Sequence, residues 1–175
     1  MNKCFESIVA RAFVEYAHVV CPGAGGDLAG IRWRMETCIP AIDCTGRGDA
    51  TGKIRRRPAA GVRSTSEVYM HIALSNFYLL SITGPKMPAG LKEDAEKTVT
   101  SKAEVVDWLK RSLDAVKEAH LAVKPDDLER KVHIADRDAT VDGMYLRIIV
   151  HANEHMGQLI AYARMTGVVP PWAKN

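Results

Sequence analysis

The chain has 175 residues and a formal net charge of +3. This length is that of one domain spanning 1–175, and it suffices to bury a core without disulfide bonds. The charge is mild and the basic residues form no long tract, which argues against a nucleic-acid-binding protein. The one basic cluster, KIRRRP at 53–58, is interpreted as a solvated loop rather than a phosphate-binding patch.

The cysteines and the apolar runs indicate a cytoplasmic protein with reduced thiols. No C-x-x-C spacing occurs, so a zinc ribbon and a thioredoxin motif are not expected. No secretory signal opens the chain, and no apolar run approaches the roughly 18 residues that cross a bilayer, so we expect no membrane association. The four cysteines are Cys4, Cys21, Cys38 and Cys44.

The first third of the chain divides into a helical part and a glycine-rich part. Apolar residues recur at helical spacing over 2–20 and predict a first helix. Residues 21–62 then carry eight of the thirteen glycines without a sustained period. A connector of that length is either a functional loop or a poorly ordered insert, and we predict little regular structure over 21–55.

Two further helices follow, each expected to begin at a capping box. Ser64 and Glu67 predict the start of a helix that runs to Gly84. The same spacing recurs over 101–104 and predicts a helix that ends before Pro125. In this second helix the apolar positions share one side, namely Val105, Trp108, Leu109, Leu113 and Val116.

The last part of the chain predicts an irregular or partly extended passage over 125–140, then a helix over 140–166 that Gly167 caps. With the first helix, this makes four helices and little strand pattern. The expected fold is therefore all-α, an antiparallel four-helix bundle.

Two histidines four residues apart, His151 and His155, lie on one face of the last helix, where they can share a divalent ion. The same face carries Ile148, Leu159 and Tyr162, so the imidazoles are expected to point inward. An H-x3-H pair is weak evidence alone, because buried histidines often only form hydrogen bonds, and a metal site needs a third ligand.

Among the other histidines, His71 is the best candidate for a third ligand. It shares an otherwise apolar helix face with Val68, Leu74 and Tyr78. His120 suits the dipole at the end of its helix. His18 and His133 are expected to face solvent.

The motifs HIALSNFYLL at 71–80 and HANEHMGQLIAYARMTGVVPP at 151–171, with RPAAGVRSTSEVYMHIA at 57–73, resemble the DinB-like (DinB/YfiT) metalloprotein family. The resemblance extends over about 58–172 and implies a four-helix bundle with His71, His151 and His155 as ligands of a divalent metal ion. Family members usually carry a helical, acidic stretch where this chain has residues 21–55.

The resemblance also implies chemistry. Three imidazoles leave a coordination position open, where a metal ion, zinc or nickel, can activate water or bind a thiol as thiolate. Characterised relatives include thiol-dependent S-transferases and a mycothiol-dependent isomerase, and relatives tend to be dimers. We therefore expect a metal-dependent thiol S-transferase that uses a low-molecular-weight thiol and a small electrophile, and that forms a homodimer.

Other interpretations stay open. The chain could be a hydrolase that uses an activated water. It could also be a non-catalytic, stress-related protein in which the metal joins two helices and the bundle binds a ligand or partner. In a third, the three histidines only bond one another and water. Glu67, Glu154 and Gln158 are candidates to orient the imidazoles, and no general base is assigned. Core or interface positions are expected for Tyr69, Tyr78, Trp108, Tyr145 and Tyr162.

Overall fold

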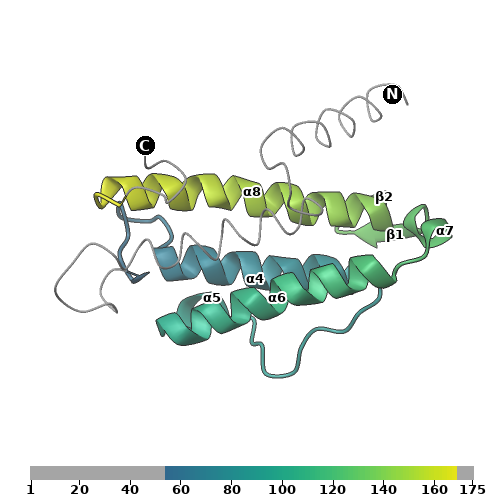
Figure 1. Ribbon diagram of the computed structural model, residues 1–175, viewed down its shortest axis with the longest axis horizontal. Helices are drawn as coiled ribbons and strands as arrows, with labels where there is room; N and C mark the ends of the chain where they lie inside the picture. The colour runs from purple at the N-terminus through teal and green to yellow at the C-terminus, as the bar shows by residue number, and fades with distance from the viewer. Residues whose placement is uncertain (1–53, 169–175) are drawn as a thin grey trace, which may run out of the picture.

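The computed structural model describes residues 54–168, and this part of the chain is mostly helical. Three long helices lie side by side, with α4 between the other two (Figure 1). The helix predicted over 2–20, and the glycine-rich segment up to residue 53, lie outside the described residues. The long helices are α4 (Thr65–Thr83), α6 (Lys102–Ala122) and α8 (Val141–Met165), and the short ones are α5 (Ala95–Thr98) and α7 (Pro125–Leu128).

The long helices are not all antiparallel. α4 and α6 run in the same direction, because the connection over 84–101 returns along the bundle before α6 begins (Figure 1). Their midpoints meet where the Asn76 amide of α4 donates a hydrogen bond to the Ser112 hydroxyl of α6, at 3.1 Å. α8 runs against both helices. The predicted antiparallel arrangement is therefore wrong for the α4–α6 pair.

A β-hairpin before α8 departs from the all-α prediction. β1 (Lys131–Ile134) and β2 (Arg137–Thr140) pair antiparallel, with His133 opposite Asp138. Thr140 then serves as the N-cap of α8, where its hydroxyl accepts a hydrogen bond from the amide of Gly143. The hairpin thus sets the first turn of the helix that carries two of the candidate ligands.

α4 begins as the sequence predicts. The Ser64 hydroxyl accepts a hydrogen bond from the Glu67 amide, and the Glu67 carboxylate accepts one from the Ser64 amide. The helix ends at Gly84, whose φ of 134° lies outside the range that L side chains favour. The second predicted capping box does not form, because Ser101 makes no side-chain cap bond, although α6 begins at the expected residue.

The core surrounds α4, which is buried on most of its circumference because α6 and α8 cover it from two sides. Tyr69 and Tyr145 are buried as predicted, whereas Tyr78 is 52% exposed. Trp108 packs against Phe77 with ring centroids 6.3 Å apart. Within residues 54–168, none of the helices combines the length and the apolar character that a bilayer crossing requires.

Candidate metal centre

The bundle brings together the three histidines that the sequence singled out. His71 comes from α4, and His151 and His155 come from successive turns of α8. The Nε2 atom of His151 lies 3.2 Å from Nε2 of His71 and 3.2 Å from Nε2 of His155. The candidate ligand atoms all lie within 4.8 Å of one another, so they could hold one metal ion.

Burial disfavours the protonated form of two of these imidazoles, those of His151 and His71. His151 is 8% exposed, and its burial, together with the neighbouring His155 and His71, lowers its pKa to about 4. Burial also lowers the pKa of His71, and the Arg63 guanidinium acts in the same direction, against the opposing effect of Glu96. Neutral imidazoles are the form that binds metal, so these two lowered pKa values are compatible with a metal site at neutral pH.

The outer nitrogens of two rings are held by hydrogen-bond acceptors. Nδ1 of His71 lies 3.1 Å from a carboxylate oxygen of Glu96 on α5, and Arg63 donates to the same carboxylate at 2.6 Å. Nδ1 of His155 lies 2.8 Å from the side-chain oxygen of Gln158, whose amide nitrogen donates to the Tyr162 hydroxyl at 2.7 Å. Both Nδ1 atoms therefore carry the proton, because a carboxylate or an amide oxygen only accepts.

This protonation pattern suits a metal ion. With their protons on Nδ1, His71 and His155 present lone pairs at Nε2 toward the shared centre. Nε2 of His151 carries at most one proton, so it can donate to only one of these two neighbours. If the histidines bonded only one another, one Nε2 atom would face another with no proton between them. A divalent ion would accept all three lone pairs. Imidazole nitrogens suit zinc and nickel in particular.

Two of the three residues predicted to orient the rings do something else. Glu67 pairs with Arg57 and caps α4, and Glu154 is exposed and lies 3.4 Å from Arg147. Gln158 orients His155 as predicted. Glu96 was missed, because it lies on the connection between α4 and α6, 25 residues from His71 and outside any helical period that points to it.

The other described histidines lie away from the centre. His120, in the last turn of α6, packs edge-on against Tyr145 with ring centroids 4.9 Å apart. His133 is exposed, as predicted, and lies 3.0 Å from a carboxylate oxygen of Asp138 on the opposite strand. His18 lies outside the described residues.

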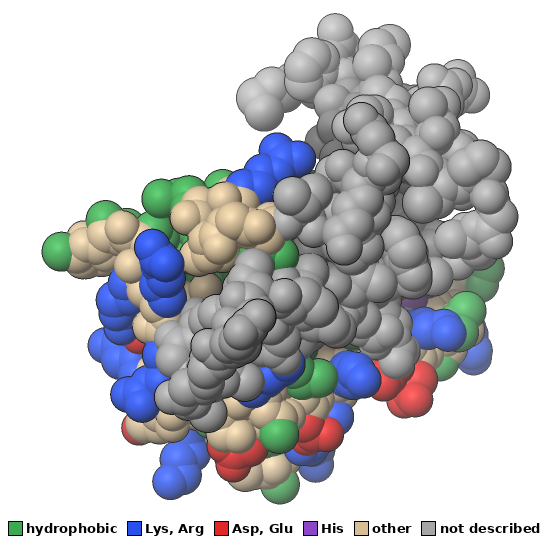
Figure 2. Space-filling view, turned by 60° about the vertical axis from the view of Figure 1, so that its left-hand side comes forward, with side chains coloured by type: hydrophobic (Ala, Val, Ile, Leu, Met, Phe, Trp, Pro, Cys, Tyr) green, Lys and Arg blue, Asp and Glu red, His purple; other side chains and the backbone are tan. Residues whose placement is uncertain are grey.

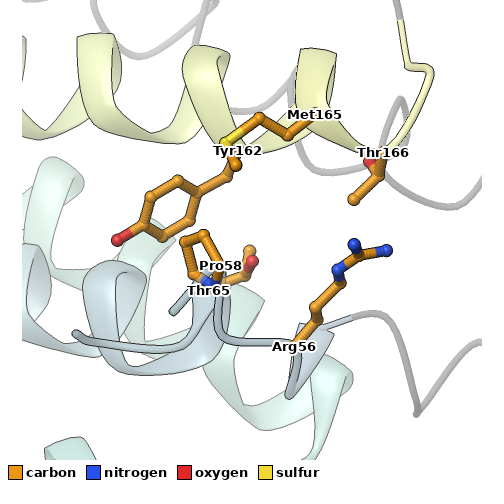
Figure 3. Close-up of a pocket in the computed structure, with 6 residues that line it drawn as sticks. All are labelled: Arg56, Pro58, Thr65, Tyr162, Met165 and Thr166. Atoms are coloured by element: carbon orange, nitrogen blue, oxygen red, sulfur yellow. The ribbon is translucent and has the colours of Figure 1, made fainter. Parts of the chain in front are cut away.

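A pocket lies between the start of α4 and the end of α8 (Figure 3), and none of the three histidines lines it. It is a hollow open to solvent, with a volume of about 240 Å³ when the adjoining solvent is included. The ring of Tyr162 forms one wall, while its hydroxyl points away toward the bond from Gln158, so this residue connects the pocket with the ring of His155. The lining residues are Arg56, Pro58, Thr65, Tyr162, Met165 and Thr166.

Basic side chains do not gather into one patch on the described surface that Figure 2 shows. Lysine and arginine side chains are dispersed there, with acidic side chains between several of them. In the cluster KIRRRP, all three arginines, Arg55, Arg56 and Arg57, are exposed, and Arg57 pairs with Glu67.

Comparisons with known proteins agree with this geometry. The family model described as the DinB superfamily matches residues 50–159, which include all three histidines. A solved structure, a DinB-like protein from Bacillus cereus ATCC 10987, is similar with a TM-score of 0.63 and 21% sequence identity, over 83% of this chain and 93% of the other. That likeness shows a shared fold. Among curated proteins, none matches this chain.

Proposed function

Since this chain belongs to the DinB superfamily, we propose that it is a divalent-metal-binding protein whose ligands are His71, His151 and His155. The observation that supports this proposal is the convergence of three Nε2 atoms, two of them with their protons held on the opposite nitrogen. Zinc and nickel are the proposed ions, because neutral imidazoles suit both.

We propose further that the chain is a metal-dependent thiol S-transferase that acts on a small electrophile. A divalent ion held by His71, His151 and His155 would keep an open position and supply Lewis acidity there, which would lower the pKa of a bound thiol or water. The protein would exclude water from the side of the ion that faces His151, because this ligand is buried.

Elemental analysis tests the metal site. The purified, untagged chain should contain about one equivalent of zinc or nickel, and a variant with alanine at His71, His151 and His155 should contain none. A variant with alanine at the exposed His133 is the matched control and should keep the metal. Equal, negligible metal in all three proteins after incubation with zinc and nickel would refute the proposal.

A cobalt-substituted sample separates the transferase from the non-catalytic alternative, in which the ion only staples α4 to α8 in a stress-related binding protein. The absorption spectrum should change when a small thiol is added, because the thiolate enters the open position. A spectrum that neither thiols nor small anions change would favour the closed, structural site.

The remaining proposals concern the whole chain. We propose that it is a single cytoplasmic domain and that two copies form a homodimer. Light scattering on the purified protein tests the dimer, and a monomer at micromolar concentration would contradict it.

A further inference from the structure

The connection between α4 and α6 places a charged group behind one ligand only. Ala95 of α5 is 3% exposed and anchors this short helix in the core, which leaves the neighbouring Glu96 beside α4. One carboxylate oxygen of Glu96 lies 3.1 Å from Nδ1 of His71, and the other accepts a hydrogen bond from Arg63. The Glu96 carboxylate is therefore held between the His71 ring and the Arg63 guanidinium.

The three rings differ in what stands behind them. His71 has a carboxylate, and His155 has the neutral amide oxygen of Gln158. Nδ1 of His151 is buried and has no hydrogen-bond partner among residues 54–168. A carboxylate behind an imidazole fixes the tautomer and makes the opposite nitrogen a stronger donor to a metal than an amide does. The three rings therefore differ in what orients them, and of these only His71 has a carboxylate at its Nδ1 among the described residues.

We propose that Glu96 is a positioning residue of the metal centre: it holds the Nδ1 proton of His71 so that Nε2 presents its lone pair to the ion, and Arg63 orients the carboxylate. This inference rests on the proposed function, because it assumes that His71 binds metal. The connection between α4 and α6 would therefore contribute to metal affinity through Glu96.

A purely structural role is the competing explanation. In that case the ion pair between Arg63 and Glu96 would only fasten the connection to the start of α4, and removal of either partner would have the same effect. A role in positioning predicts unequal effects. Loss of Glu96 removes the acceptor from His71, whereas loss of Arg63 leaves that acceptor in place.

Zinc affinity, measured by competition with a chelating dye, tests the proposal on the full chain. We expect Glu96→Ala to weaken zinc binding by about 10- to 100-fold, the range seen when outer partners of metal ligands are removed. Glu96→Gln, which keeps an acceptor oxygen, should recover part of the loss, and Arg63→Met should have the smaller effect. Glu93→Ala changes an exposed glutamate on the same connection and should bind zinc as the unmodified chain does.

Nitrogen-15 spectra of histidine-labelled, metal-free protein at pH 8 provide a readout that a structural role would not change. The proton of His71 should reside on Nδ1 in the unmodified chain and shift toward Nε2 in Glu96→Ala. Zinc binding by the unmodified chain with no change in affinity or tautomer in Glu96→Ala would overturn this inference alone. Absence of zinc binding by the unmodified chain would instead overturn the proposed function.

Discussion

Replacing the imidazole of His151 should reduce the loss of stability that acid causes in the metal-free protein. The pKa of this imidazole is about 4 in the folded chain, against an ordinary value of 6.5, because the ring is buried and faces two other imidazoles. Between these two values the unfolded chain binds more protons than the folded chain, so stability falls as the pH falls. One pKa unit corresponds to about 1.4 kcal/mol, so the imidazole lowers the free energy of unfolding by about 3 kcal/mol from pH 7.5 to pH 4.

Urea unfolding in the presence of EDTA measures this effect. The free energy of unfolding falls between pH 7.5 and pH 4, and this fall should be about 3 kcal/mol smaller for His151→Leu than for the unmodified chain. Leucine fills a similar volume without a titrating group. Carboxylates that titrate over the same range contribute equally to both proteins and cancel. Equal pH dependence in His151→Leu and the unmodified chain would refute the reasoning.

Three further predictions concern the metal, the start of α4 and the core. Zinc at 1,000 times its dissociation constant should stabilise the chain by about 4 kcal/mol in thermal or urea unfolding, and His155→Ala should abolish that gain. Glu67→Ala should lower the free energy of unfolding by about 1–2 kcal/mol, because the capping box and the ion pair with Arg57 are lost. The zinc stoichiometry should stay the same, and a change in it would contradict the conclusion that Glu67 does not act on the metal centre. Ser112→Ala should lower the free energy of unfolding by about 1–3 kcal/mol, because the fully buried Asn76 amide loses its acceptor. A change below about 0.5 kcal/mol, roughly the scatter of surface substitutions, would contradict that contribution.

Local patterns predicted the features that depend on neighbours in sequence. The capping box of Ser64 and Glu67 forms because its bonds join residues three apart. His151 and His155 share a face because residues four apart stand one turn from each other. His71 was a candidate from its apolar face, and the family resemblance singled it out, since the sequence carries no signal for a distance between helices.

The connections show where local patterns were insufficient. The residues over 125–140 alternate too weakly to predict the hairpin, which cross-strand pairing stabilises. The direction of α6 relative to α4 depends on whether the segment 84–101 turns tightly or returns along the bundle. Helical periodicity specifies which face is buried and leaves that choice open.

Local sequence patterns predicted α4, α6 and α8, the apolar face of α6 and the histidines that could bind a metal, because each depends on residues within a few positions of one another. The packing of the helices brings His71 to the pair on α8, and places the Glu96 carboxylate and the neutral Gln158 amide against two of the rings. Sequence patterns could not predict this arrangement, because hydrogen bonds and ligand geometry depend on distances in space. Those distances are set only when α5 and α8 pack against α4.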